Sequence, residues 1–318
     1  MPPTPDAARL HAAVAALELV VDDATCDTRA AAVPSYGEPR PTSTVTLRGG
    51  GLAGRGEHVG WTPAAHAAFA GACADVPRGR TSVGEWSAAL AASVRHPYDR
   101  AALEAAAIDL ACRQRRTSLF RLAGVAPRPV RYVVSYARLA DPSAALATGD
   151  ELKLDVDPAW SDDVLVALAR SGRVAIVDFK GRDGGAERVA RALPAALLED
   201  PPLPWPPVVR ARTSLDAAIV APDDVDAADP PPAAVNLKPA RMGGPLAALD
   251  AAARAARRAI PVYLGGMFEI GIGRAQLHVL AALLASDGPN DVAPIATDGL
   301  PAARPPRLVV PDADGFGA

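Results

Sequence analysis

The segment 235-VNLKPARMGG-244 shows the pattern on which the fold prediction rests. A short apolar run ends at one charged residue, Lys238, and a proline and two glycines follow within six residues. An apolar run closed by residues that break regular structure is typical of a buried strand and its loop. The helical segment 245-PLAALDAAARAARRA-259 comes next, and the apolar run 259-AIPVYLGG-266 follows it. A strand, a helix and a strand in this order predict two parallel strands joined by a crossover helix.

The same alternation begins near residue 130 and continues through this segment. Helical segments such as 162-DDVLVALARSG-172 fit between the apolar runs. So many strand–helix units favour a closed barrel over an open sheet, and we predict an α/β fold with a modified (β/α)7β barrel of the TIM type. The predicted strands are 130-VRYVVSYA-137, 151-ELKLDV-156, 173-RVAIVDF-179, 195-AALLED-200, 213-TSLDAAI-219, 233-AAVNLKP-239 and 259-AIPVYLGG-266.

The first hundred residues have a different pattern, which predicts an N-terminal α+β capping domain. The run 42-TSTVTLRG-49 alternates like a strand, and the alanine-rich segments 63–74 and 85–93 are helical in character. The stretch 49-GGGLAGRG-56 loosely resembles a phosphate-binding loop, but it lacks the Lys-Ser/Thr ending and a following helix, so a hairpin turn is favoured. We therefore predict a capping domain over 1–100, a barrel over 101–300 and a C-terminal tail over 301–318 that returns to the cap.

The composition narrows the class of function. The chain has 318 residues, 22% of them charged, and a formal net charge of −3, so no basic surface is expected to bind nucleic acid. No apolar run reaches the length of a membrane span, and the N-terminus lacks the basic and apolar regions of a secretory signal. The widely separated Cys26, Cys73 and Cys112 are expected to be reduced thiols in a cytoplasmic protein.

Charged residues recur where the predicted strands end. Lys153, Asp178, Glu199, Asp216 and Lys238 follow one another at intervals of about one strand–helix unit, so their side chains are expected to meet at one barrel mouth. Three carboxylates from successive strands suit Mg²⁺ (or Mn²⁺), which prefers oxygen ligands. Two lysines facing each other across the barrel could remove and return a proton next to a substrate carboxylate.

These segments resemble, in order, the muconate lactonizing subgroup of the enolase superfamily (the mandelate racemase/muconate lactonizing enzyme family). The segment 235-VNLKPARMGG-244 is the closest match and contains the family's base on strand six. Lys153 matches the second lysine of the family's Lys-x-Lys motif on strand two. The other matching segments are 56-GEHVGW-61, 104-EAAAIDLACRQ-114, 178-DFKG-181, 199-EDPP-202, 216-DAA-218, 261-PVYLGGMFEIGIGRAQLHVLAAL-283 and 289-PNDVAP-294.

The resemblance implies a Mg²⁺-dependent isomerase or lyase that acts on a small carboxylate through an enediolate. Asp178, Glu199 and Asp216 would hold the metal, and Lys153 and Lys238 would be the acid and base. The subgroup includes o-succinylbenzoate synthases, N-acylamino acid racemases, dipeptide epimerases and muconate cycloisomerases. The Asp-x-Asp signature of dipeptide epimerases is absent from 290-NDVAP-294, which weighs against that activity. The resemblance also implies a homo-oligomer.

Three residues depart from the family pattern. Glu151 replaces the first lysine of the Lys-x-Lys motif, and on a strand it would point the same way as Lys153 and keep that lysine protonated, or form a structural ion pair with it. Lys180 replaces an asparagine, so its ammonium could compete with the metal or replace it. Ala217 replaces a supporting glutamate. These changes leave open an alternative function, a divergent barrel that binds a small anion or a partner without this catalysis.

Three further residues are candidates for contact with the substrate. Glu269 could hydrogen-bond a substrate carboxylate, although a packing or salt-bridge role is an equal alternative. Tyr36 matches the region of the family's mobile substrate lid, with an ordinary surface aromatic as the alternative. Lys180 is the third candidate. An alternative strand register would put Asp155 in the place of Lys153.

Overall fold

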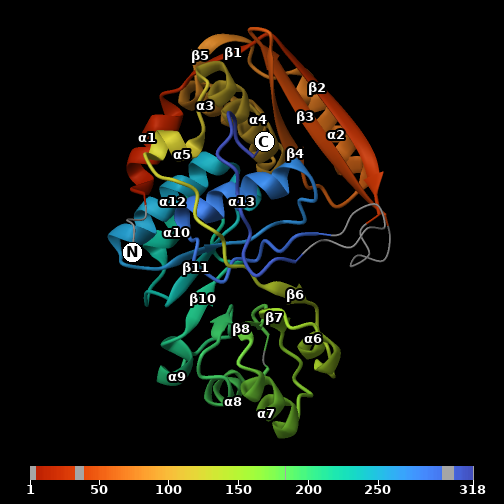
Figure 1. Cartoon of the computed structure of the whole chain (residues 1–318), viewed down its shortest axis with the longest axis vertical. Coiled ribbons are helices and arrows are strands. Elements are labelled where there is room, and N and C mark those ends of the chain that lie inside the picture. Colours follow the sequence, from red (N-terminus) through yellow and green to blue (C-terminus); the bar gives the residue numbers. More distant parts are fainter. Residues whose placement is uncertain (1–4, 33–38, 183, 296–303, 318) are drawn as a thin grey trace.

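Seven strands form one parallel sheet that curls into the body of a barrel. The computed structural model describes residues 5–32, 39–182, 184–295 and 304–317, and within them the strand order is β12-β11-β10-β9-β8-β7-β6. Helices flank this sheet, and a separate antiparallel sheet from the N-terminal part of the chain lies at the upper right of the view (Figure 1). The predicted fold class is confirmed. The strands are β6 (Val134–Tyr136), β7 (Leu152–Asp155), β8 (Val174–Asp178), β9 (Leu197–Glu199), β10 (Thr213–Leu215), β11 (Ala234–Leu237) and β12 (Val262–Leu264).

Each predicted apolar run contains one of these strands. The observed strands are shorter than the runs, because the final residues of most runs already belong to the loops at the barrel mouth. All residues of β8 and β11 are buried, since helices cover the outer face of the sheet and side chains fill its interior.

The segment at Asn290 bridges the two outer strands of the sheet. Asn290 forms an isolated parallel bridge with Tyr132, just before β6, and Asp291 forms another with Gly265, just after β12. The Asn290 side chain also accepts a hydrogen bond from the backbone nitrogen of Leu264 at 2.8 Å. The last strand implied by the family resemblance is therefore reduced to two bridging residues.

Helices follow most of the strands, and the two longest of them, α12 and α13, lie between the parallel sheet and the N-terminal part of the chain (Figure 1). These helices are α6 (Ser143–Ala147), α7 (Asp162–Ser171), α8 (Ala186–Ala192), α9 (Pro207–Arg210), α10 (Pro222–Ala227), α11 (Pro239–Met242), α12 (Pro245–Arg257) and α13 (Ile272–Leu284). No helix in the described ranges is both long and apolar enough to cross a membrane.

The N-terminal part contains an antiparallel sheet of β2 (Asp23–Ala31), β3 (Arg40–Gly49) and β4 (Leu52–His58). Gly50 and Gly51 connect β3 to β4 with φ angles of 57° and 75°, a conformation that glycine adopts without strain. The hairpin predicted here is confirmed. The remaining elements are α1 (Ala7–Ala15), β1 (Glu18–Val21), α2 (Pro63–Ala74), β5 (Gly79–Ser82), α3 (Val83–Ser93), α4 (Pro97–Arg115) and α5 (Leu119–Ala123).

The helix α4 joins the N-terminal part to the barrel and is buried over most of its length. Strand β4 approaches α4 so closely that a Cβ atom at Gly56 would lie 2.0 Å from the carbonyl oxygen of Ala102. The described part of the C-terminal segment also contacts α4. The backbone nitrogen of Phe316 donates to Asp109 at 2.7 Å, and the Phe316 side chain is fully buried.

Candidate active site

The five charged residues predicted from the strand ends lie at the same end of the parallel sheet. Lys153 is on β7, while Asp178 and Glu199 are the last residues of β8 and β9 and are partners in the ladder. Asp216 and Lys238 directly follow β10 and β11. All five side chains are buried, and each takes part in at least one ion pair. Their spacing in the sequence brings them together because the carboxyl ends of parallel strands share one edge.

The Lys153 ammonium lies among three carboxylates. Its Nζ is 2.6 Å from Glu199 Oε2 and 3.4 Å from both Asp178 Oδ2 and Asp291 Oδ2. Burial disfavours the charged lysine most strongly, but these three carboxylates together outweigh burial and raise the pKa of Lys153 well above its usual value. Lys153 is therefore an ammonium group in this arrangement.

Glu151 does not act on Lys153 in the way that the sequence predicted. The Glu151 carboxylate pairs with Arg131, whose Nε lies 2.7 Å from Glu151 Oε2. Strand β7 begins only at Leu152, and its register shifts between Leu152 and Lys153, so the expected alternation of side chains does not hold across this point. Lys153 occupies the position in the mouth that the alternative register would have given to Asp155.

Lys180 reaches the carboxylates from the loop after β8. Its Nζ lies 2.8 Å from Asp178 Oδ2 and 3.0 Å from Asp155 Oδ1, and its backbone nitrogen donates to Asp178 Oδ1 at 2.9 Å. The strand ends at Asp178, and Lys180 has a φ of 51°, in the left-handed region. The approach to Asp178 therefore comes from a tight turn and not from a continued strand.

Asp216 is shared by two cationic side chains. Lys238 Nζ lies 2.8 Å from Asp216 Oδ2, and Arg241 Nη1 lies 2.8 Å from Asp216 Oδ1. Burial raises the pKa of Asp216, but Lys238, Lys153 and Arg241 lower it more, to about 2. Arg241 was not among the predicted site residues, although it lies only three residues after Lys238, in the short helix α11.

Two polar residues that the sequence analysis also missed support Glu199 and the β10 loop. Asn236 Nδ2 donates to Glu199 Oε1 at 3.0 Å. Complete burial raises the pKa of Glu199 to about 7, although the nearby charge of Lys153 acts to lower it. Asp200 accepts hydrogen bonds from the backbone nitrogens of Asp216 and Ala217, both at 2.9 Å. The Asp200 carboxylate thus stabilises the loop in which Ala217 replaces the expected glutamate.

Asp291, which bridges to Gly265 after β12, is also part of the site. Besides its contact with Lys153, it accepts a hydrogen bond from Ser135 Oγ at 2.6 Å. Burial opposes the charge on Asp291, but Lys153 and Lys238 lower the pKa of Asp291 below its usual value. The position of Asp291 depends on closure of the sheet between β12 and β6, which no local pattern around it indicates.

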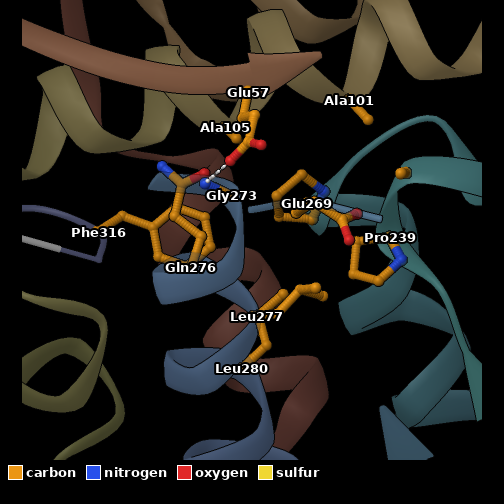
Figure 2. Close-up of a pocket in the computed structure, with 12 residues that line it drawn as sticks. Glu57, Ala101, Ala105, Pro239, Glu269, Gly273, Gln276, Leu277, Leu280 and Phe316 are labelled. Carbon is orange, nitrogen blue, oxygen red and sulfur yellow. Dashed lines mark hydrogen bonds between the residues drawn. The ribbon is translucent and has the colours of Figure 1, made fainter. Parts of the chain in front are cut away.

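Glu269 lies in a cavity between α4, α11 and α13, together with Glu57 and Pro239 (Figure 2). Its Oε2 accepts a hydrogen bond from the backbone nitrogen of Met267 at 2.8 Å, and burial raises the pKa of Glu269. Glu57, from β4, accepts hydrogen bonds from three backbone nitrogens at the start of α13, including that of Gly273 at 2.9 Å. Contact between Glu269 and a substrate stays a prediction, and Tyr36 lies outside the described residues.

Asp178, Glu199 and Asp216 have the ligand type that a divalent metal prefers. Asp178, Glu199 and Asp216 supply only carboxylate oxygens, and they come from three adjacent strands. Within the described residues, no three His, Cys, Asp or Glu side chains form a ready-made metal cage, because cationic groups hold the oxygens instead. In the described part of the chain, the ion pairs at the barrel mouth join five carboxylates to four cationic side chains. The members are Asp155, Asp178, Glu199, Asp216 and Asp291, with Lys153, Lys180, Lys238 and Arg241.

Comparison with known protein families gives two matches that together cover most of the chain. Residues 12–122 match "Domain of unknown function (DUF8230) N-terminal domain", and residues 126–298 match "Domain of unknown function (DUF8230) C-terminal domain". A 57-residue segment is 46% identical to the N-succinylamino acid racemase of Thermus thermophilus. This segment spans 18% of the chain and 15% of that racemase, so the chain matches only a small part of the length of this curated relative.

Solved structures extend the similarity to nearly the whole chain. The dipeptide epimerase of Methylococcus capsulatus, in complex with a Mg ion, has a TM-score of 0.78 and 24% identity over 94% of this chain and 99% of that one. The same enzyme has also been solved with Mg and the dipeptide L-Arg-D-Lys. The muconate cycloisomerase of Pseudomonas fluorescens has a TM-score of 0.73 and 20% identity over 94% of this chain and 96% of that one. At these identities the similarity shows the fold.

Proposed function

The chain belongs to the DUF8230 family and has the fold of the enolase superfamily, and from this premise we propose that it abstracts the α-proton of a small carboxylate substrate. The observation that supports this proposal is the pair of lysines at the barrel mouth. Lys153 and Lys238 come from strands separated by β8, β9 and β10, so they reach a ligand in the mouth from different sides. The result would be an isomerisation or, with a suitable leaving group, an elimination.

The contacts of the two lysines suggest different roles. Lys153 faces three carboxylates that favour its ammonium form, which suits a proton donor. Lys238 contacts one carboxylate, Asp216, and Arg241 shares the charge of that group. We therefore assign the acid to Lys153 and the base to Lys238.

Asp178, Glu199 and Asp216 are the residues that would hold Mg²⁺ (or Mn²⁺). When bound, a divalent ion supplies positive charge beside the substrate carboxylate, where negative charge develops during proton removal. Asn236 keeps Glu199 oriented from the next-but-one strand, and the backbone contacts of Asp200 fix the position of Asp216.

The proposed step begins when the Lys238 amine takes the α-proton and the electron pair of the C–H bond moves into the substrate carboxylate as an enediolate. Return of a proton from the Lys153 ammonium on the opposite face would invert the α-carbon, which is racemisation or epimerisation. If the electron pair of the enediolate instead forms a C=C bond and expels a hydroxyl group from the β-carbon, that group takes the proton held on Lys238 and leaves as water, which is syn-dehydration. If the group expelled is the carboxylate oxygen of a lactone, the ring opens, which is cycloisomerisation in its reverse direction. In these cases one lysine acts as base and the other stabilises charge.

The names of the relatives suggest where the substrate should be sought. N-acylated amino acids, dipeptides and muconate-type acids correspond to the racemase, the epimerase and the cycloisomerase, and a succinylbenzoate precursor would suit dehydration. The missing Asp-x-Asp signature makes dipeptides the weakest of these candidates.

Proton NMR in D₂O tests the proposal directly. Each candidate substrate is incubated with the protein and Mg²⁺, and loss of the α-proton signal reports exchange with solvent. We expect exchange with at least one class, and we expect Lys238→Ala to lower its rate at least ~100-fold, the usual effect of removing a general base. Lys153→Ala should block inversion.

A panel without any exchange, in protein shown by circular dichroism to be folded, would contradict the proposed enzyme. Full turnover by Lys238→Ala would contradict the role of that residue while leaving the activity in place. Exchange without inversion would favour elimination or cycloisomerisation over racemisation.

A second candidate function is a barrel that binds a small anion without this chemistry. Lys180 favours it, because its half-exposed ammonium lies beside the carboxylates and is accessible to an anionic group. Calorimetry with small carboxylic acids, in parallel with the exchange assay, separates the two functions, since binding without exchange supports this alternative. We further propose a cytoplasmic homo-oligomer, which cell fractionation and light scattering would test.

A further inference from the structure

Lys180 is a lysine, and lysine is rare in this chain. Only three of the 33 basic residues of the chain are lysines, and the other two are Lys153 and Lys238. All three lie at the same barrel mouth and contact its carboxylates. The other basic residues are arginines, and one of them, Arg241, also contacts a carboxylate at this mouth. Lys180 therefore adds a third ammonium group to the carboxylates of the mouth.

The backbone directs Lys180 toward Asp178. The φ of 51° places the backbone of Lys180 in the left-handed region, which residues other than glycine, asparagine and aspartate seldom adopt. Its backbone nitrogen donates to Asp178 Oδ1, and its Nζ returns to Asp178 Oδ2, so the one residue contacts both oxygens of this carboxylate. The turn thus holds the ammonium directly on a residue of the proposed metal set.

Asp155 anchors the ammonium from the other side. Asp155 and Asp178 are partners on the adjacent strands β7 and β8, so two carboxylates would lie side by side without a cation between them. Lys180 Nζ bridges them, at 3.0 Å from Asp155 and 2.8 Å from Asp178. A divalent ion that bound Asp178 Oδ2 would compete with this bridge.

We propose that the Lys180 ammonium is a built-in competitor of the divalent metal at Asp178, so that the chain binds Mg²⁺ more weakly than it would with a neutral residue at this position. The inference rests on the proposed metal role of Asp178. Replacing Lys180 by a neutral residue removes one positive charge from the ion pairs at the mouth and leaves Asp178 Oδ2 with the longer contact to Lys153, at 3.4 Å. Both changes favour binding of a divalent cation.

Isothermal titration calorimetry of the metal-depleted protein with Mg²⁺, repeated with Mn²⁺, measures this competition without a substrate. We expect Lys180→Asn to lower the Kd at least about tenfold relative to wild type, in line with the removal of a unit charge a few ångströms from the ion. Asparagine tolerates the left-handed conformation, so this variant should keep the turn. Lys180→Arg keeps the charge and should bind no more tightly than wild type.

Two controls make the result specific. Arg182→Gln removes a positive charge from an exposed residue in the same loop and should change the Kd less than about twofold, because solvent screens it. The double variant Lys180→Asn with Asp178→Asn should lose the gain in affinity, because position 178 then carries no carboxylate.

A Kd for Lys180→Asn within twofold of wild type would overturn the competition. Absence of divalent binding in Lys180→Asn would overturn it as well, because Asp178 would then not be a metal residue. Neither result depends on turnover, so α-proton exchange by the wild-type protein would still support the proposed function after this inference had failed.

Discussion

Glu104 joins helix α4 to the first turn of α12 from a fully buried position. Its carboxylate accepts hydrogen bonds from the backbone nitrogen of Leu246, at 2.8 Å, and from Ser87 Oγ. Burial raises the pKa of Glu104 to about 7, more than these hydrogen bonds and the charge of Arg100 lower it. The fold therefore favours the neutral acid at a position where the unfolded chain would carry a charge at neutral pH.

The substitution Glu104→Gln removes the titration and keeps the shape and an oxygen that can accept the Leu246 N–H. A pKa of about 7 in the folded protein against 4.5 in the unfolded chain corresponds to ~3 kcal/mol, at ~1.4 kcal/mol per pKa unit. Because the folded value is the higher one, the folded protein binds more protons between these pH values. The stabilisation is complete below pH 4.5 and is lost as the pH rises through 7.

Urea unfolding of wild type and variant in parallel, at intervals from about pH 4 to pH 8, isolates this residue because all other titrating groups are common to both proteins. The free energy of unfolding of Glu104→Gln should rise relative to that of wild type by ~3 kcal/mol across the range. A constant difference across the range would refute the raised pKa of Glu104. A variant that loses relative stability as the pH rises would refute the sign of the argument.

Two substitutions test the packing around α4. Gly56→Ala should lower the free energy of unfolding by at least ~3 kcal/mol in urea titrations, because its Cβ would lie 2.0 Å from the carbonyl oxygen of Ala102. The matched Gly71→Ala, on α2 with open space around its Cβ position, should be neutral or stabilising by up to ~1 kcal/mol, and equal effects of the two would contradict the close approach. Phe316→Ala should cost ~3–5 kcal/mol in the same assay, because its side chain is fully buried, and a cost below ~1 kcal/mol would show that the C-terminal segment is not part of the core.

The parallel strands were predictable because their signal is local. A buried strand between helices must be apolar over its whole length, so each of the seven runs is visible in the sequence. The residue at the end of each strand is then known from its position in the chain, which is why the sequence predicts that Asp178, Glu199 and Lys238 share one mouth. The final strand was less predictable, because the bridges of Asn290 and Asp291 depend on how the curled sheet closes.

The sequence by itself determined the fold class, the seven strands and which charged residues gather at their ends, because strand periodicity and the length of a strand–helix unit are local properties. The tertiary structure alone decided which charges pair. Glu151 lies two positions from Lys153 but pairs with Arg131, while Asp291, far along the chain, contacts Lys153. Ion pairs depend on distance in space and on burial, and both are set by the register and closure of the sheet.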